Sequence, residues 1–537
     1  MMALFLCCLT VTSVCADASS WAYATLNKLS LDEKIGQLLI PAVSFTQSKN
    51  SMFSESEIIE FIQKYHIGGC ILLDPAEPQK YADLLHHLQQ ANRNIKNSIP
   101  LLMILDAEWG ASMRIAGLDE IRIPFNLTLG AIQDNKLIYQ AGKEVARQLK
   151  ILGVHLNCAP VVDVNCNPNN PIINRRSFGQ NPYHVAKKAN YFLHGLQDAG
   201  IIACAKHFPG HGDTTTDSHV TLPVINHSIE QLQRTELIPF KEIINNGVMG
   251  VMSGHLLVPV LDTQHTASTS AYMLKNILRN DYAFEGLIIT DGLDMQGILT
   301  HYSPAQAACK ALCAGNDLLL IPIDIPNTIR AIKDAIERGK LSMEEIDQHV
   351  LRILQAKEWA NQQCKEYSST VMQKLLTNEA QELSKTLYAH AITLVKNENN
   401  LLPLSDKKKT AIIICGTDTE TVFAEKMQAH ADILYADTLT SFDIQEYDTV
   451  VFALYGVQYQ KPPLYNMTNN TISLIHETAK QQTDVALILF GNPYALAHFK
   501  SVPTVLVAYE EHAYAQEAGA NVMLGNLISN GQLPISV

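Results

Sequence analysis

The sequence predicts an α/β protein of two domains, a (β/α)8 TIM-like barrel followed by a smaller α/β sandwich domain. The chain has 537 residues, which exceeds what a single hydrophobic core usually organises. From about residue 20 to residue 325, eight continuous apolar runs alternate with amphipathic segments, as in a parallel sheet covered by helices. Eight such repeats fit one closed barrel, and a second alternation begins near residue 391.

The eight apolar runs are the strands expected in the barrel, and the segments between them are its helices. The expected strands are residues 35–43, 67–73, 100–108, 154–164, 201–207, 250–257, 286–291 and 317–323. The expected helices, which carry apolar residues at helical spacing, include residues 57–65, 81–94, 137–152, 182–199, 229–246, 305–314 and 328–338. In such barrels the chemistry lies at the C-terminal ends of the strands.

Two more helical segments, residues 343–361 and 373–390, lead away from the barrel. We therefore expect a catalytic barrel over residues 17–365, a helical linker over 366–390 and a second domain over 391–537. The second domain is predicted to hold strands at residues 410–415, 449–455, 486–490 and 504–509, and helices at 420–430, 473–482 and 515–524. The chain end, residues 535–537, is predicted as a short last strand or a tail.

Composition is ordinary for a soluble globular enzyme. Hydrophobic residues make up 47% of the chain and charged residues 17%, which excludes a disordered protein. The net charge of −13 disfavours nucleic acid as a partner, because phosphate binding needs clustered Lys and Arg. Cysteines beyond residue 16 are scattered without C-x-x-C pairs, so we expect free thiols. We expect a monomer.

The first 16 residues resemble a signal peptide, being short, apolar and closed by Val14-Cys15-Ala16. We therefore predict export. A cytoplasmic protein is the alternative, because the usual basic residues are missing and the first lysine is Lys28. Lipid attachment at Cys15 is a poor fit to the residues before it. The rest of the chain has no uninterrupted apolar stretch of about 18 residues, so no transmembrane segment is expected.

Polar side chains gather where the predicted barrel strands end. They are Asp106 and Glu108, Asp163 and Asn165, Lys206 and His207, Ser253 and His255, and Asp291. An acid at the end of an apolar strand is held rigidly at the barrel mouth, which favours Asp291 as a nucleophile. Asp294 is the rival acid, although its place after the strand favours a helix cap.

Residues 206–219 pack Lys, His and Asp side chains into one segment after the fifth predicted strand. Its proline and glycines predict a loop. Three interpretations compete: ordinary polar loop residues, a metal site, or acid/base catalysis by the Asp217–His219 pair. The candidate metal ligands would be His207, His211, Asp213 and His219. In an extended loop, side chains two residues apart point the same way, so Asp217 could orient His219.

This loop resembles the family 3 glycoside hydrolases, and specifically their β-N-acetylglucosaminidase branch. That branch carries K-H-F-P-G-H-G-D-x-x-x-D-S-H on a mobile loop, and residues 206–219 match it completely. The resemblance implies that His219 is the acid/base, that Asp217 orients it and that Asp291 is the nucleophile. Most glycosidases use two carboxyl groups instead.

Other segments agree with the resemblance. Asp106-Ala107-Glu108-Trp109-Gly110, followed by Arg114, is similar to the family's D-x-E-G-G…R stretch, with Trp109 where the family usually has Gly. Residues 174–179 resemble its R-S-F-G stretch. The resemblance implies that the terminal sugar is held by Asp106, Arg114, Arg176, Lys206 and His207. A buried ion pair with Asp163 is the alternative role for Lys206 and His207. Residues 391–404 and 531–534 also match, so the likeness covers nearly the whole chain.

The resemblance implies a retaining β-N-acetylhexosaminidase without metal or organic cofactor, acting on GlcNAc-containing oligosaccharides or peptidoglycan-derived muropeptides. Within the class, a phosphorylase or a β-glucosidase is the alternative. A metal-dependent hydrolase built on the His-rich loop and a non-catalytic sugar-binding protein are alternatives from other classes. In related β-glucosidases the second domain supplies the acid/base; should that hold here, Glu510 and Glu511 are the candidate acids.

Overall fold

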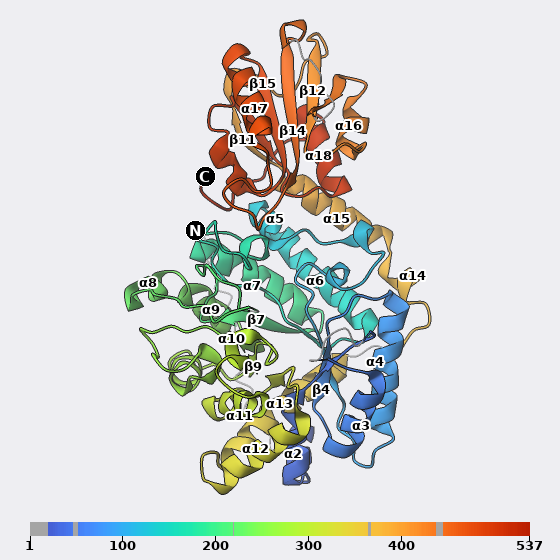
Figure 1. The fold of residues 1–537 in the computed structure, drawn as a ribbon. Helices are drawn as coiled ribbons and strands as arrows, with labels where there is room; N and C mark the ends of the chain where they lie inside the picture. Colours follow the sequence, from blue (N-terminus) through green and yellow to red (C-terminus); the bar gives the residue numbers. More distant parts are fainter. Residues whose placement is uncertain (1–19, 47–51, 219, 364–366, 437–443) are drawn as a thin grey trace, which may run out of the picture.

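The protein has a barrel domain and a smaller sheet domain, which lie at opposite ends of the long axis in Figure 1. The computed structural model describes residues 20–46, 52–218, 220–363, 367–436 and 444–537. The predicted signal segment, residues 1–16, lies outside the described residues. None of the helices in the described part combines the length and hydropathy needed to span a bilayer.

The barrel is a curled sheet in which every strand pair is parallel. Its strands are β1 (Leu39–Ile40), β2 (Ala42–Val43), β3 (Met52–Phe53), β4 (Gly69–Leu72), β5 (Leu102–Leu105), β6 (Leu156–Asn157), β7 (Ile202–Phe208), β8 (Gly250–Ser253), β9 (Leu287–Thr290) and β10 (Leu319–Leu320). A bridge between Ile289 and Leu318 joins β9 to β10, and β10 pairs with β1, which closes the ring. The predicted barrel is thus confirmed.

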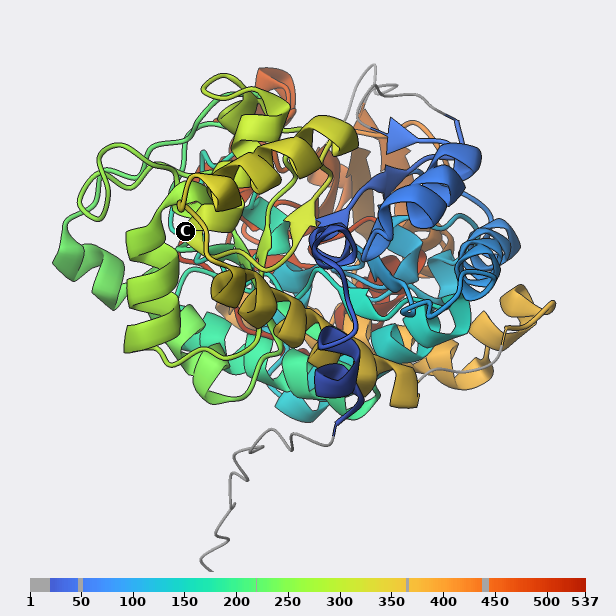
Figure 2. The same ribbon diagram turned by 90° about the horizontal axis from the view of Figure 1, so that it is seen from below.

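Helices surround the strands, as the view from below in Figure 2 shows. They are α1 (Trp21–Leu26), α2 (Leu31–Gln37), α3 (Glu55–Tyr65), α4 (Pro78–Arg93), α5 (Asn126–Ala131), α6 (Asn135–Leu152), α7 (Pro182–Asp198), α8 (Ile229–Arg234), α9 (Leu237–Asn245), α10 (Gln296–Leu299), α11 (Pro304–Ala314), α12 (Ile325–Glu337) and α13 (Met343–Gln363), with the π-helix η5 (Tyr272–Asp281). Helix α6 illustrates the local signals: Asp134 caps its first turn, and Gly153 ends it at φ 88°.

Most ladder-forming strands of the barrel are shorter than the apolar runs that predicted them, although β7 has the predicted length. The run 154–164 contains only β6, yet Val161, Val162 and Val164 are buried beyond it in the barrel rim. The run 35–43 begins as the end of α2, and the expected helix 229–246 breaks into α8 and α9. One detail was wrong: Met295, not Asp294, occupies the N-cap position of α10. The chain end, residues 535–537, forms no strand, as the alternative of a tail predicted.

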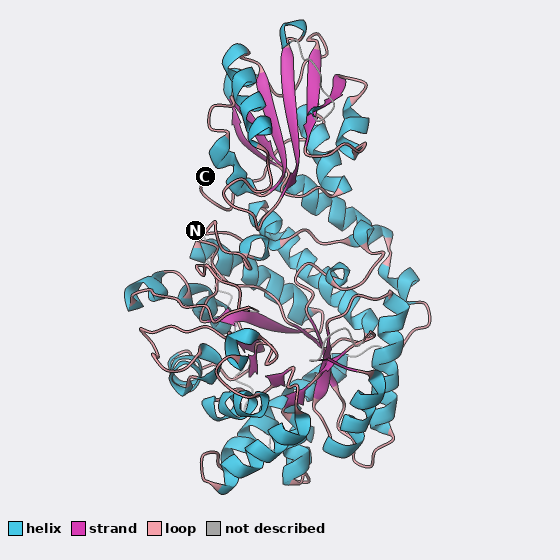
Figure 3. Cartoon of the chain, viewed as in Figure 1, coloured by secondary structure: helices cyan, strands magenta, loops and turns pink. Residues whose placement is uncertain are grey.

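The second domain is a six-stranded sheet with helices on its faces (Figure 3). The strand order is β11 (Thr393–Asn397), β16 (Thr504–Val507), β15 (Val485–Gly491), β14 (Thr449–Val457), β12 (Thr410–Cys415) and β13 (Asp432–Tyr435), and only β11 runs antiparallel to its neighbour. Its helices are α16 (Val422–Met427), α17 (Asn469–Gln481) and α18 (Ala513–Met523). Buried side chains cover both faces of this sheet.

Two segments connect the domains. Helices α14 (Val371–Leu375) and α15 (Asn378–Ala391) lead from the barrel to the sheet, and α15 packs on both α5 and α18. The C-terminal segment returns to the barrel, where the amide of Gln532 donates to the carbonyl of Ala131 at 2.9 Å. The amide of Gln180 in turn donates to the carbonyl of Pro534 at 3.0 Å. The second domain is therefore attached to the barrel at both of its ends.

Candidate functional site

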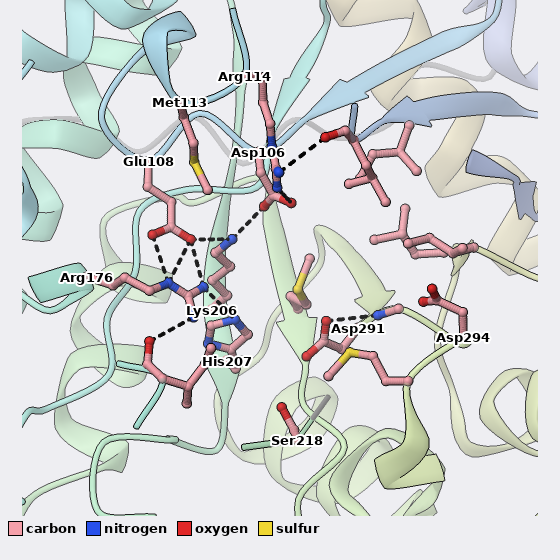
Figure 4. A pocket seen from close by; sticks show the side chains of 18 of the residues that line it. Asp106, Glu108, Met113, Arg114, Arg176, Lys206, His207, Ser218, Asp291 and Asp294 are labelled. Atoms are coloured by element: carbon pink, nitrogen blue, oxygen red, sulfur yellow. Dashed lines mark hydrogen bonds and ion pairs between the residues drawn. The ribbon is translucent and has the colours of Figure 1, made fainter. Parts of the chain in front are cut away.

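A pocket of about 510 Å³ opens at the C-terminal ends of the barrel strands. All five residues predicted to bind the sugar line it, together with Asp291: Asp106, Arg114, Arg176, Lys206 and His207. Figure 4 shows Glu108, Arg176 and Lys206 on one side of this pocket and Asp291 and Asp294 on the other. The pocket thus sets a group of paired charges opposite two carboxylates.

Strand β7 presents two consecutive side chains to the pocket. In a regular strand successive side chains alternate between faces. The pairing of β7 with β8 is irregular between Ala205 and Phe208, so the strand departs from that alternation. Lys206 and His207 both line the pocket as a result. Such irregularities are common beside active sites, where they redirect a side chain.

Cations and carboxylates alternate along one wall of the pocket. The ammonium of Lys206 donates to Oδ1 of Asp106 at 2.6 Å and lies 2.8 Å from Oε1 of Glu108. Arg176 binds Glu108 through two nitrogens, with Nη2 2.7 Å from Oε1 and Nε 3.0 Å from Oε2. Arg114 Nη2 lies 3.3 Å from Oδ2 of Asp106. Bidentate, charge-assisted contacts of this kind fix side chains firmly.

These contacts keep the wall charged although it is buried. Burial alone would raise the pKa of Asp106, but Lys206 and Arg114 outweigh it and hold the pKa below its ordinary value. Glu108 is fully buried, and Arg176 and Lys206 likewise hold its pKa well below the ordinary value. Burial would lower the pKa of Lys206, but Asp106 and Glu108 raise it. The wall therefore offers ionised acceptors and donors to a sugar's hydroxyl groups.

His207 is held by a buried carboxylate behind the pocket. Oδ2 of Asp163 lies 2.8 Å from Nδ1 of His207, and Oδ1 accepts the backbone N–H groups of His207 and His211. Arg176 Nη2 lies 3.3 Å from the other ring nitrogen. The alternative ion pair with Asp163 is thus correct for His207 and wrong for Lys206, whose partners are Asp106 and Glu108. His207 both contacts this acid and lines the pocket.

Asp291 stands directly after β9, as predicted from the sequence. Its amide donates to the carbonyl of Ser253 on β8, and its Oδ1 accepts the amide of Gly292 at 2.8 Å. His255 supports the next turn, with Nε2 3.0 Å from the carbonyl of Gly292. Burial lowers the pKa of His255, so it supports the turn as a neutral ring. A carboxylate is thereby fixed by its own backbone at the pocket floor.

The loop after β7 reaches the same pocket. Ser218 lines it, and the carbonyl of Ser218 accepts the amide of Gly297 at 3.1 Å, beside the turn that follows Asp291. Asp217 precedes Ser218, and its carbonyl accepts the amides of Val220 and Thr221. Asp217 itself is not among the residues that line the pocket. His219 lies outside the described residues.

The candidate metal ligands in this loop do not converge where the structure describes them. His211 Nδ1 lies 2.7 Å from Thr214 Oγ1, and its Nε2 lies 3.1 Å from Ser218 Oγ. Asp213 is bound instead to His227. Among the described residues no three His, Cys, Asp or Glu side chains are grouped so that they could hold a metal ion.

Several lining residues were not among those predicted to bind the sugar. Glu108 follows the same strand as Asp106, and its strand-end position was the signal for it. Asp294, Asp74 and His211 also line the pocket. Trp109 and four methionines form much of its apolar side: Met52, Met113, Met252 and Met295. Nothing in the sequence pattern distinguishes these methionines from core residues, because only the closed barrel brings them together.

Glu510, one of the two candidate acids of the second domain, is occupied away from the pocket. Its Oε2 lies 2.8 Å from Arg122 Nη2, and its Oε1 accepts the hydroxyl of Thr128 at 2.6 Å and the amide of Phe125 at 2.9 Å. Glu511 accepts the amide of Gly456. Neither residue lines the pocket. Glu510 instead joins the second domain to the barrel.

The arrangement can bind a polyol and attack it. Ionised carboxylates and fixed cations suit sugar hydroxyl groups, and Asp291 offers a rigid nucleophile from the opposite side. Residues 30–356 match the model described as the glycosyl hydrolase family 3 N terminal domain. The chain is similar to beta-hexosaminidase A of Pseudoalteromonas piscicida, at 32% identity over 73% of this chain and 69% of that protein.

Two further relatives cover almost the full length. The beta-N-acetylglucosaminidase/beta-glucosidase of Cellulomonas fimi is 25% identical over 92% of this chain and 88% of its own. A solved structure of a glycoside hydrolase family 3 beta-N-acetylglucosaminidase from Paenibacillus sp. str. FPU-7 aligns with a TM-score of 0.78 and 29% identity. That alignment covers 95% of this chain and 99% of the other. The likeness therefore includes both domains.

Proposed function

The chain belongs to glycosyl hydrolase family 3 as a β-hexosaminidase, and from that premise we propose that it removes terminal β-linked N-acetylglucosamine through a covalent intermediate on Asp291. Asp106, Arg114, Arg176, Lys206 and His207 hold the sugar. Their contacts orient the anomeric carbon toward Asp291, since fixed geometry lowers the barrier to attack.

The reaction is a double displacement. Protonated His219 donates its proton to the leaving oxygen while the carboxylate of Asp291 attacks the anomeric carbon and forms a glycosyl ester. Neutral His219 then takes a proton from water, which attacks the same carbon and releases the sugar and Asp291. Asp217 orients the imidazole and stabilises its cation. His219 thus gives up one proton in the first step and regains one from water in the second, so the enzyme ends in its starting state.

One observation carries this proposal: Ser218, between Asp217 and His219 in the chain, lines the same pocket as Asp291. The loop tip and the strand-end acid therefore face a shared space, and the charged wall completes it (Figure 4). This is the arrangement that a proton donor and a nucleophile need on one substrate.

The natural substrate we propose is a GlcNAc-bearing muropeptide from peptidoglycan, which rests on the family resemblance of residues 206–219. Such a substrate accords with export through residues 1–16, which we also propose.

Hydrolysis of 4-nitrophenyl glycosides tests the proposed function. We expect release from the N-acetylglucosaminide to exceed release from the glucoside by about 100-fold or more in kcat/KM, because a site that fits the acetamido group loses binding energy without it. Product should be free sugar with or without phosphate, and EDTA should leave the rate unchanged. A preference for the glucoside, a sugar phosphate as product, or loss of activity in EDTA would each favour one of the alternatives.

A further inference from the structure

Three ionisable side chains meet at the base of the loop that carries Asp217, outside the sugar pocket. Nε2 of His227 lies 2.7 Å from Oδ2 of Asp213, and its Nδ1 lies 3.2 Å from Oε1 of Glu236. Glu236 directly precedes α9. We call Asp213, His227 and Glu236 the clasp. None of the three lines the pocket, so the proposed reaction leaves them without a role.

The clasp connects the two limbs of this loop. Asp213 lies on the outgoing limb and His227 on the returning limb, so residues 214–226 lie between them. The returning limb is also bound to the barrel, because the amide of Ile225 donates to the carbonyl of Leu257 at 2.9 Å. On the outgoing side, a Cβ added to Gly210 would lie 2.7 Å from Cβ of Glu236. Glycine at 210, with φ 134°, lets the loop lie directly against Glu236.

The clasp contains a carboxylate that His227 must compensate. The side chain of Glu236 is 1% exposed, and His227 is its ion-pair partner among the described residues. Burial raises the pKa of Glu236, and His227 opposes that rise. Cys166 also faces the group, but burial and then the two carboxylates raise the pKa of its thiol to about 12, so it stays neutral. Because both ring nitrogens of His227 face carboxylate oxygens, the ring can compensate a charge that burial alone would make costly.

We propose that the clasp positions the acid/base loop, with the two ring N–H groups of His227 holding the carboxylates of Asp213 and Glu236 together. His227 is then a positioning residue that acts on catalysis through Asp217 and His219. The inference rests on the proposed function, since it assigns the loop the role of proton donor. The loop tip is the part that must be positioned, because Ser218 contacts Gly297 beside the turn after Asp291.

Misplacing a proton donor has a recognisable kinetic effect. The first chemical step needs the proton only when the leaving group is a poor one, since a stable phenolate departs unprotonated. The attack by Asp291 is common to every substrate. Loss of the clasp should therefore slow substrates with poor leaving groups selectively, whereas general damage to the fold slows all of them equally.

The test compares wild type with His227→Gln on two substrates, N,N′-diacetylchitobiose and 2,4-dinitrophenyl N-acetyl-β-glucosaminide. We expect kcat/KM to fall about 100-fold on the disaccharide, the usual size of acid/base catalysis, and by less than about threefold on the activated aryl glycoside. In His227→Gln, azide should accelerate turnover of the aryl glycoside and yield the β-glycosyl azide, because azide attacks the intermediate without a base.

Two variants complete the design. Glu236→Gln keeps the shape of the side chain and offers an amide N–H to His227. It should lower kcat/KM on the disaccharide about tenfold with the same selectivity. This variant serves as the test if His227→Gln does not fold. His265→Gln is the matched control, because His265 Nδ1 lies 3.2 Å from Oδ2 of Asp262 in a histidine–carboxylate pair outside the loop. It should leave kcat/KM unchanged on both substrates.

Equal losses of kcat/KM on both substrates, or no loss on either, would overturn the proposal that the clasp positions the loop. Failure of the proposed function would look different. Asp291→Ala, with the clasp residues unchanged, would then retain activity on the aryl glycoside. The two proposals can thus fail separately.

Discussion

Lys206 shows how single residues determine the properties of this pocket. Its ammonium lies within 2.8 Å of both Asp106 and Glu108, and Arg176 shares Oε1 of Glu108 with it. Each charge is compensated by the next, so the wall stays ionised although Glu108 is fully buried. A sugar that binds there meets side chains that are already fixed, so these side chains lose little conformational entropy on binding.

Glu108→Gln tests whether this fixed wall matters for binding. A neutral amide cannot compensate both Lys206 and Arg176, which then repel each other. We expect kcat/KM for the aryl N-acetylglucosaminide to fall about 10- to 100-fold, mostly through KM, as expected for the loss of a charged hydrogen bond. Steady-state kinetics of the purified variant measures this.

Glu144→Gln is the matched control, because Glu144 also pairs with an arginine, Arg147, at 2.7 Å, but on α6 away from the pocket. It should leave KM unchanged. A Glu108→Gln enzyme with wild-type KM would show that the wall plays no part in binding the substrate.

Strand-end positions predicted which residues gather, and only the structure shows their pairing. Asp106, Lys206 and Asp291 could be placed at the pocket from apolar runs alone, because all strands of a parallel barrel end on one side. That Lys206 contacts Asp106 while His207 contacts Asp163 depends on the irregular pairing of β7, which no local pattern reveals. Their roles in binding remain predictions.

At the scale of elements, apolar runs located most strands and overestimated the length of several in the barrel, whereas β3 and β13 lie outside the predicted runs. β6 has two residues within a predicted run of 154–164, because the buried rim residues beyond it pair with β7 irregularly, through an isolated bridge between Val161 and Lys206. The helix expected over 229–246 divides at Thr235 and Glu236, where Glu236 turns inward to His227. A buried contact of this kind overrides helical periodicity, and the sequence offered no signal of it.

Asp317 ties three elements together beneath the barrel. It is fully buried just before β10 and contacts Arg279 of η5 at 2.6 Å, with His349 and Arg352 of α13. Burial would raise the pKa of Asp317, but Arg279 and His349 lower it to about 2. The carboxylate of Asp317 therefore connects the segment before β10 to the helices outside it through charged contacts. We call this group the Asp317 joint.

This joint should stabilise the fold in a pH-dependent way. The pKa of Asp317 is lower in the folded state, so its contribution is complete above about pH 4 and is lost as the pH falls toward 2. The shift corresponds to about 2 kcal/mol of unfolding free energy. Urea unfolding at a series of pH values should show a shallower acid-side decline in Asp317→Asn than in wild type, and a lower stability at pH 7.

Asp32→Asn, which removes an exposed pair with Lys333, should change stability by less than about 1 kcal/mol. Parallel acid profiles for wild type and Asp317→Asn would contradict the account of the joint.

At the scale of the whole molecule, the second domain completes the barrel rim through fixed contacts. Arg175 stacks on Phe125 with its guanidinium carbon 4.1 Å from the ring centroid, and Tyr459 of the second domain lies on the same guanidinium at 5.8 Å. Glu510 binds Arg122 and Thr128 of the barrel. Trp109, which lines the pocket, packs edge-on against Phe125, so the second domain supports the pocket wall indirectly.

The two-domain architecture could be predicted because both parts show long, regular alternations of strand and helix. How the domains meet could not be predicted, since Tyr459, Glu510 and the barrel residues they contact are far apart in the sequence and lie in irregular segments.

The central claim is that Asp291 forms a covalent bond to the sugar, and trapping measures it most directly. Wild-type enzyme treated with a 5-fluoro-N-acetylglucosaminyl fluoride should gain one fluorosugar mass, because the fluorine slows release of the intermediate more than its formation. Peptide mass spectrometry should place that label on Asp291. A label on Asp294 or Glu510, or full inactivation without any label, would contradict the account.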